Sequence, residues 1–97
     1  MKEADLQRRI QAEIKRIGGK VIKIHGNAYS VAGTPDLIGS LDSRPFAIEV
    51  KLPGEKPTTK QTYELAQWAA QGWATGIAHS IDEALRLVGA SGGVCGG

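Results

Sequence analysis

A short apolar segment with two charged residues on one side lies in the middle of this 97-residue chain. The segment reads PFAIEVK, a composition that predicts a β-strand. Side chains two apart on a strand point to the same face, so Glu49 and Lys51 project together. The apolar residues Phe46, Ile48 and Val50 then point the other way, toward a core. Because a strand this apolar is usually central, a charged pair on it is costly unless it is partnered or binds a metal ion.

A second acidic residue, Asp36, precedes the previous apolar segment, in the string GTPDLIG. Two carboxylates can hold a hard divalent cation such as Mg²⁺, which prefers oxygen ligands and keeps part of its water shell. A lysine beside that cation can orient an attacking water or neutralise charge on a phosphate. Asp36, Glu49 and Lys51 together therefore predict metal-dependent hydrolysis of phosphodiester bonds. Taken alone, Asp36 after Pro35 also fits a turn, and Glu49 with Lys51 also fits a surface ion pair.

Further strings accompany this pattern: HGNAY before GTPD, KLPG after the strand, KPTTKQ at the next predicted helix and GWATGIA after that helix. Together they resemble the VRR-NUC domains, which are small virus-type replication-repair nucleases of the PD-(D/E)xK superfamily. The similarity runs from about Glu3 to Leu87. It implies a restriction-endonuclease-like core and a Mg²⁺- or Mn²⁺-dependent DNA endonuclease whose products carry a 5′-phosphate.

The resemblance also implies a set of site residues. Asp36 and Glu49 bind the metal, the backbone carbonyl of Val50 adds a ligand, and Lys51 assists the attacking water. Gln61 lies where these nucleases place a glutamine near the metal-bound water or the scissile phosphate. The string TTKQ is also a capping box, in which this glutamine bonds back to the start of its own helix, and both interpretations stay open.

Nucleases of this family usually supply a further acidic ligand from the first helix, and this chain has two candidates. Apolar residues at helical spacing define one stripe of that helix: Leu6, Ile10, Ile14 and Ile17. Glu3 falls inside the stripe, at about 60° from Leu6 on a helical wheel, and Glu13 falls at its border, at about −20°. We therefore prefer Glu3 as the ligand, whereas Glu13 also fits an exposed polar face.

Periodicity and turn residues predict an α/β chain in the order α-β-β-β-α-β-α, with a central mixed sheet flanked by helices. The helix predicted over 58–71 has Tyr63, Ala66, Gln67 and Ala70 spaced along one side. The predicted elements are a first helix stopped by Gly18 and Gly19, strands over 20–25, 36–39 and 45–51, a turn over 40–44, a helix over 58–71, a strand over 73–79 and a final helix capped by Ser80.

Composition predicts one small domain over residues 1–88 and a flexible Gly-rich tail over residues 89–97. The chain has no apolar run as long as a membrane span and no signal-peptide pattern, so we expect a cytoplasmic protein that does not enter membranes. A single cysteine, Cys95, excludes an internal disulfide framework and a cysteine-based zinc site.

The net charge of +2 is too small to indicate nucleic-acid binding, but its distribution is uneven. Residues 1–35 carry seven basic and three acidic side chains, which can follow a phosphate backbone or simply form a solvated surface. Lys23 and His25 share one strand face and Tyr29 lies in the following loop, so all three are candidate DNA contacts. His79 has no evident partner in the sequence.

The expected substrate is DNA, in particular branched DNA such as four-way (Holliday) junctions, because small stand-alone domains of this kind resemble phage or bacterial junction-cleaving nucleases. Two cuts in symmetry-related strands need two sites, which a C₂ homodimer supplies. Two alternatives remain: a flap- or nick-type nuclease that acts as a monomer, and a catalytically silent DNA-binding module on a nuclease-like fold. The intact Asp36, Glu49 and Lys51 argue against a silent module.

Overall fold

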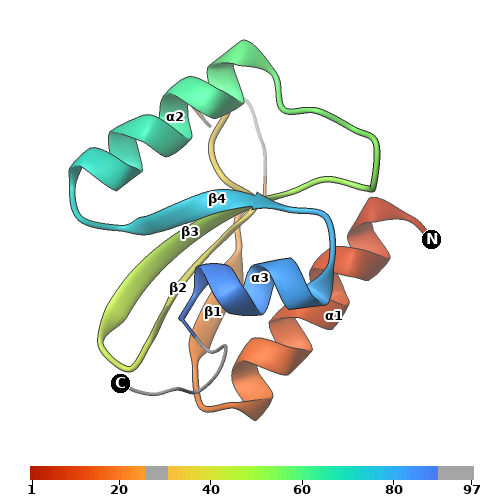
Figure 1. Cartoon of the computed structure of the whole chain (residues 1–97), viewed down its shortest axis with the longest axis vertical. Coiled ribbons are helices and arrows are strands. Elements are labelled where there is room, and N and C mark those ends of the chain that lie inside the picture. The colour runs from red at the N-terminus through yellow and green to blue at the C-terminus, as the bar shows by residue number, and fades with distance from the viewer. Residues whose placement is uncertain (26–30, 90–97) are drawn as a thin grey trace.

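The computed structural model describes residues 1–25 and 31–89 of the chain. In these residues four strands form one mixed sheet flanked by three helices, and the predicted order α-β-β-β-α-β-α is confirmed (Figure 1). The elements are α1 (Glu3–Arg16), β1 (Lys20–Lys23), β2 (Leu37–Leu41), β3 (Arg44–Val50), α2 (Thr59–Ala70), β4 (Ala74–Ala78) and α3 (Ile81–Leu87).

The sheet has the strand order β1-β2-β3-β4. Strands β1, β2 and β3 are antiparallel, and β4 is parallel to β3 because α2 carries the chain back before β4 begins. The β2–β3 turn is shorter than the predicted turn over 40–44: Leu41 pairs with Arg44, so only two residues form it. Those two residues, Asp42 and Ser43, have φ of 51° and 66°, the left-handed backbone that two-residue hairpin turns require.

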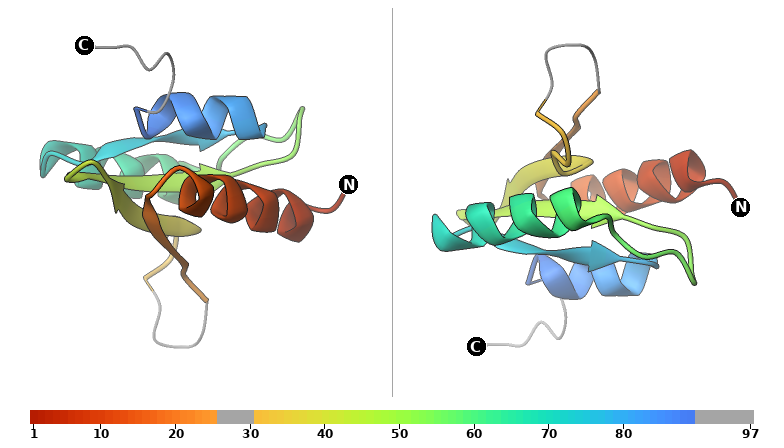
Figure 2. Two further views of the ribbon diagram at one scale, coloured as in Figure 1. Left: turned by 90° about the horizontal axis from the view of Figure 1, so that it is seen from below. Right: turned by 90° about the horizontal axis from the view of Figure 1, so that it is seen from above.

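The hydrophobic core lies on one face of the sheet, under α1 and α3, and α2 covers the other face along β3 and β4 (Figure 2). Strand β3 is central, and its apolar residues point into the core as the alternation predicts. The buried core residues are Leu6, Ile10, Ile14, Val21, Leu37, Leu41, Phe46, Ile48, Val50, Ala78, Ala84 and Val88.

Helix α2 packs on the sheet through Leu65, its one buried residue among those described. The side marked by Tyr63, Ala66, Gln67 and Ala70 faces solvent instead, and the Tyr63 side chain is exposed. Trp68 packs edge-on against Trp73, with ring centroids 4.5 Å apart, at the corner between α2 and β4. This contact joins the end of α2 to the residue that precedes β4.

Two helix starts follow the predicted capping chemistry. Thr58 is the N-cap of α2, so the helix begins one residue later than predicted, and Ser80 caps α3 by accepting a hydrogen bond from the Glu83 N–H at 3.1 Å.

No described helix is long and apolar enough to cross a membrane. Tyr29 and the predicted tail from residue 90 onward, including Cys95, lie outside the described residues.

Candidate active site

Asp36 and Glu49 lie beside each other at one end of the sheet. Asp36 directly precedes β2, and the antiparallel register pairs Leu37 with Ile48, which brings the two acidic residues onto neighbouring positions. The Asp36 carboxylate accepts a hydrogen bond from the Val50 backbone N–H at 2.9 Å, and its carbonyl accepts one from Ile24 at 2.8 Å. Backbone N–H groups from the two neighbouring segments, those of Val50 and Ile24, therefore hold Asp36 in place, and it is not a free turn residue.

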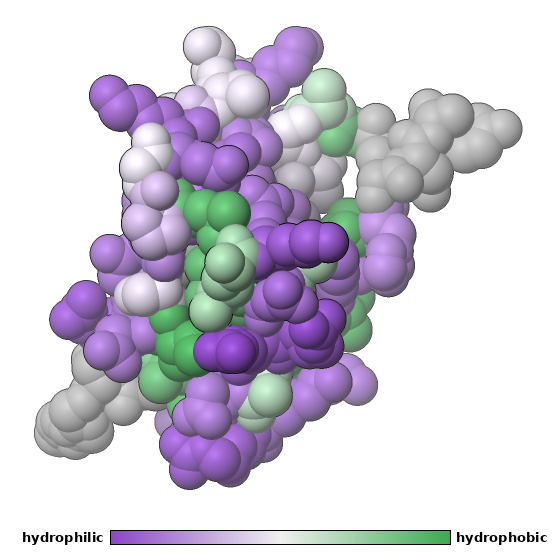
Figure 3. Space-filling model, turned by 90° about the vertical axis from the view of Figure 1, so that its right-hand side faces the viewer, coloured by the Kyte–Doolittle hydropathy of each residue, from purple (hydrophilic) through white to green (hydrophobic). Residues whose placement is uncertain are grey.

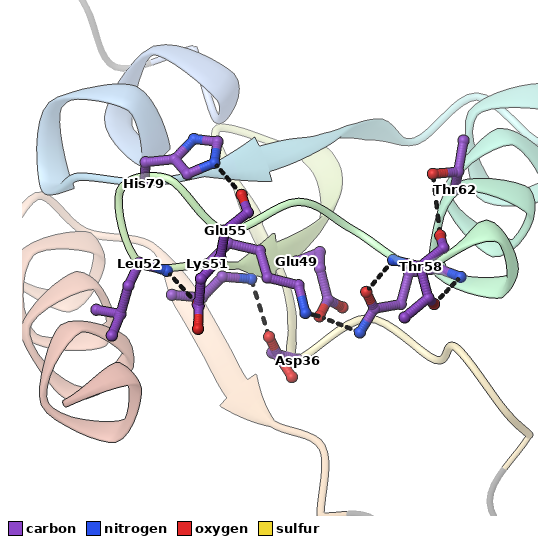
Figure 4. Close-up of polar contacts among 10 residues, drawn as sticks. Asp36, Glu49, Lys51, Leu52, Glu55, Thr58, Thr62 and His79 are labelled. Carbon is purple, nitrogen blue, oxygen red and sulfur yellow. Dashed lines mark hydrogen bonds and ion pairs between the residues drawn. The ribbon is translucent and has the colours of Figure 1, made fainter.

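Glu49 lies on the face of β3 that α2 covers, and its side chain is only 2% exposed (Figure 4). Its Oε2 accepts a hydrogen bond from Gln61 Nε2 at 2.8 Å and lies 3.9 Å from Lys51 Nζ. Its Oε1 is buried and has no hydrogen-bond partner in the described part of the chain. A buried carboxylate with an unpaired oxygen is unfavourable by itself and fits a position where a cation binds.

Gln61 uses both ends of its amide. Its Oε1 accepts a hydrogen bond from the Thr58 N–H at 2.8 Å, and its backbone N–H donates to Thr58 Oγ1 at 3.1 Å, so the predicted capping box is confirmed. Its Nε2 meanwhile donates to Glu49. The first turn of α2 thus holds one oxygen of the candidate site in place, and the two interpretations of Gln61 are compatible in one conformation.

Gly33 connects the loop before Asp36 to the same turn of α2. A Cβ atom at this glycine would lie 2.6 Å from the carbonyl carbon and oxygen of Lys60, a distance that backbone atoms cannot accommodate. Its φ of 84° also disfavours any side chain. Close packing of the GTPD loop on α2 therefore explains why glycine stands here, and it fixes the spacing between Asp36 and Gln61.

The electrostatic field at the site is acidic. Burial and, after it, the charge of Asp36 together raise the pKa of Glu49 to about 8, although the Lys51 charge acts in the opposite direction. Burial also raises the pKa of Glu3, followed by the charge of Asp36, and Lys51 again acts in the opposite direction. Burial and neighbouring negative charge disfavour the ionised form of both carboxyls more than Lys51 offsets, so a divalent cation would be favoured here.

The two acidic candidates of the first helix occupy different environments. Glu3, the first residue of α1, is half-buried and lies close enough to Asp36 and Lys51 for both charges to affect its pKa. Glu13 lies three turns away and pairs with Arg16, with 2.9 Å between Oε1 and Nη2. The structure brings Glu3, not Glu13, toward the candidate site.

The predicted DNA contacts are only partly described. Lys23 ends β1 opposite Leu37, one residue from Asp36, and is half-buried, whereas His25 is exposed. Tyr29 lies outside the described residues. The backbone of Lys23 therefore lies at the same end of the sheet as Asp36, but its position shares the face of Leu37 rather than that of Glu49, and no described contact ties Lys23 or His25 to the acidic site.

Three polar residues near the site were not predicted from the sequence. Glu55 helps to raise the pKa of Glu3, which places its carboxyl near the acidic site. Gln7, one helical turn after Glu3, is 5% exposed with an unpartnered Oε1 in the described structure. His79 bonds to Glu55 and Glu83. A helical wheel places Gln7 beside the apolar stripe, but no local pattern marks the other two residues.

The donor set is sparse but suits a hard cation. Within residues 1–25 and 31–89, no three His, Cys, Asp or Glu side chains gather closely enough to form a metal cluster. The fixed protein oxygens are the carboxylates of Asp36 and Glu49. Mg²⁺ commonly binds through one or two carboxylates while it keeps several waters and takes substrate phosphate oxygens. The residues therefore fit such an ion and do not fit a zinc site built from histidine and cysteine.

Solved structures share this fold. A VRR_NUC domain superposes with a TM-score of 0.72 at 25% sequence identity and covers 89% of this chain and 92% of its own. A VRR_NUC domain protein gives a TM-score of 0.76 at 22% identity over 91% of this chain and 85% of its own. The chain has a VRR-NUC nuclease-like fold.

The VRR-NUC-like fold also matches a Holliday junction resolvase, Hjc of Archaeoglobus fulgidus. The TM-score is 0.63 at 23% identity, over 77% of this chain and 65% of the resolvase. Neither the protein-family models nor the curated proteins gave a match. The likeness therefore rests on three-dimensional structure, and the roles of individual residues have to be argued from this chain's own site.

Proposed function

We propose that this chain is a metal-dependent DNA endonuclease that acts on branched DNA. The observation that carries the proposal is the buried Glu49 carboxylate, whose Oε1 has no partner in the described structure and whose neighbour is a second carboxylate, Asp36. Burying such a pair costs stability unless a cation compensates its charge. The likeness to VRR_NUC domains and to a Holliday junction resolvase supports DNA as the substrate.

Each residue of the site has a chemical role in the proposal. Asp36 and Glu49 would hold a Mg²⁺ or Mn²⁺ ion, with the Val50 carbonyl and Glu3 as further predicted oxygen donors. Such an ion supplies a more acidic bound water and positive charge beside the phosphate.

Lys51 and Gln61 act around these carboxylates. The Lys51 ammonium, 15% exposed and on the same side of the sheet as Glu49, can orient the attacking water or offset charge on the phosphate oxygens. Gln61 donates to Glu49 Oε2 and so holds this carboxylate, whose Oε1 would be available to the ion. Hydrolysis would leave a 5′-phosphate, as the resemblance implies.

Branched DNA is the proposed substrate and a C₂ homodimer the proposed assembly. One copy of the chain has one site, and a four-way junction needs two cuts in symmetry-related strands, which two copies provide. Binding would depend on phosphate contacts from basic residues such as Lys23, with little base reading, so it should weaken steeply with added salt.

The proposal is tested by cleavage of a DNA panel: four-way junctions, flaps, nicked duplexes and linear duplexes, each with Mg²⁺, Mn²⁺ or a chelator. We expect metal-dependent cutting with a preference for junctions, and light scattering should give about twice the chain mass. Junction binding without cutting under any metal would favour a silent DNA-binding module. A monomer that cuts flaps or nicks would retain the nuclease and remove the junction-resolving assignment.

A further inference from the structure

The four residues that follow Lys51 form a tight turn. The Glu55 N–H donates to the Leu52 carbonyl at 3.0 Å, and the Leu52 N–H donates to Glu55 Oε1 at 2.8 Å. Pro53 stands at the second position and Gly54, with φ of 90°, at the third, which is the pattern of a type II turn. Glu55 therefore closes the turn with both its backbone and its side chain.

Apart from Leu52, which packs against the edge of the hydrophobic core, this turn has little burial to hold it in place. Pro53, Gly54 and Glu55 are all exposed, and Leu52 is half-buried. Leu52 and Pro53 border an apolar hollow of about 540 Å³ on the side of the molecule shown in Figure 3. A segment with so few buried contacts opens locally unless specific hydrogen bonds restrain it.

His79 supplies such a restraint from another part of the chain. It follows β4 directly, next to Ala78, whose carbonyl accepts the Lys51 N–H at 3.0 Å. The His79 Nε2 lies 3.2 Å from the Glu55 carbonyl oxygen (Figure 4). The ring therefore ties the last residue of the turn to the junction between β4 and α3.

Glu83 holds the other side of this ring. The His79 Nδ1 lies 3.1 Å from Glu83 Oε1, and the His79 backbone N–H donates to the same oxygen at 2.7 Å. These hydrogen bonds lower the pKa of Glu83, which keeps it a carboxylate. Because a carbonyl and a carboxylate both accept, only an imidazolium donates to both partners, and a neutral ring with its proton on Nε2 would donate to Glu55 alone and leave Nδ1 as an acceptor beside Glu83.

We propose that His79 is a positioning residue that holds the Leu52–Glu55 turn, and through it Lys51 and the Glu55 carboxyl, against the acidic site. This inference rests on the proposed nuclease function for its consequence in catalysis. Lys51 directly precedes the turn, so movement of the turn changes where its ammonium lies relative to Glu49. The Glu55 carboxylate accepts from the Leu52 N–H, so it would move together with the turn.

The first test measures the restraint without reference to cleavage. His79→Phe keeps the ring bulk but removes both N–H donors, whereas His79→Gln keeps an amide donor. Amide hydrogen exchange at Leu52 and Glu55 should accelerate about 10-fold or more in His79→Phe and much less in His79→Gln. The amides of Ala84 in α3 and of Val88 at its C-cap should keep their wild-type rates. Unchanged exchange at the turn, or equal acceleration at all four amides, would overturn the proposal.

A second variant covers the case in which His79→Phe does not fold. Glu83→Gln keeps an oxygen acceptor but removes the negative charge that orients the ring. Exchange at Leu52 and Glu55 should then accelerate by a smaller factor than in His79→Phe, while His79→Gln still reports on the direct bond. Wild-type exchange at Leu52 and Glu55 in Glu83→Gln would contradict the role of the ring in holding the turn.

The second test measures the consequence for catalysis on metal-loaded protein and junction DNA. We expect kcat to fall about 10-fold in His79→Phe with KM and calorimetric metal affinity unchanged, because only the placement of Lys51 is disturbed. His79→Gln should recover most of the loss. Accelerated exchange with an unchanged kcat would overturn the positioning role. If the wild-type chain cuts no DNA, the proposed function fails, and the exchange experiment still decides whether His79 holds the turn.

Discussion

The two faces of β3 are buried almost equally, but burial has opposite consequences on them. Phe46, Ile48 and Val50 are fully buried under α1 and α3, where every side chain meets other hydrocarbon. On the other face Glu49 is just as inaccessible, yet its carboxyl has a raised pKa and one unpartnered oxygen within the described chain. One face of this strand stabilises the fold, and the other holds the carboxylate of the candidate site at a cost in stability.

The energies explain why both faces occur on one strand. Full burial of a side chain such as Ile48 contributes about 1.5–3 kcal/mol. Removing a charged carboxylate from water costs several kcal/mol unless it is well paired. A core on one side can therefore offset a costly carboxylate on the other, and the rigid strand fixes the position of that carboxylate. Substitutions on the two faces should separate activity from stability.

The largest expected effect is loss of activity on the acidic face. Asp36→Asn and Glu49→Gln keep size and hydrogen-bonding oxygens but remove the charge that would hold the metal. Cleavage of junction DNA should fall by about 10³-fold or more. Binding, measured by gel shift, should persist or tighten because a negative charge facing the phosphates is lost.

The matched control lies on the opposite face. Ile48→Val should leave kcat unchanged while it lowers the free energy of unfolding by about 0.5–1.5 kcal/mol. If either acidic-face variant cleaves at the wild-type rate, the proposed site is wrong. If Ile48→Val loses activity while still folded, the two faces are not independent.

A smaller loss is expected for Lys51→Met, which replaces the ammonium with a side chain of similar length. The cleavage rate should drop by about 10²-fold, the scale of one lost electrostatic or acid–base group. Calorimetry should still detect metal binding, because the carboxylates are intact. Joint loss of metal affinity and fold would instead identify Lys51 as a structural ion-pair partner of Glu49.

The sequence predicted the parts of this comparison that depend on local periodicity. Strand alternation assigned Glu49 and Lys51 to one face, and the capping pattern predicted the bonds of Gln61 to Thr58. The bond between Gln61 and Glu49 was not predicted, because it depends on how α2 packs. The bond from His79 to the Glu55 carbonyl spans 24 positions and joins a strand end to a loop. No local pattern encodes such contacts, which arise only when β4 pairs with β3.

The comparison extends to the first helix, where the expected effect is smaller again. Glu3→Gln should lower the cleavage rate or the metal affinity by about 10-fold, as loss of an outer or weakly bound donor does. Glu13→Gln should change neither, because Glu13 pairs with Arg16 away from the site. Both variants remove one charge from the same helix, so each controls for the other. The reverse ranking would assign the ligand to Glu13.

The last comparison concerns stability rather than activity, namely the pH dependence of the free energy of unfolding in metal-free protein. Glu49 has a pKa of about 8 when folded and about 4.5 in the unfolded chain, so the folded state keeps a proton that the unfolded state releases. This group therefore makes the free energy of unfolding decrease as pH rises from about 4.5 to about 8, after which its contribution is constant. Glu3, with its raised pKa, acts in the same direction. The lowered pKa values of Asp5, Glu13 and Glu83 place their contributions at more acidic pH, outside that window.

Urea unfolding of metal-free protein at several pH values tests this expectation, with Glu49→Gln as the matched variant. The wild type should lose stability across the window, while the variant should show a flatter profile and exceed the wild type at pH 8. Added Mg²⁺ should restore wild-type stability more at pH 8 than at pH 5, because the ion binds the ionised carboxylates. A wild-type profile that coincides with that of Glu49→Gln would mean that Glu49 is ionised at little cost. Burial of the Glu49 carboxyl would then not lower the free energy of unfolding, and the proposed contrast between the two faces of β3 would be wrong.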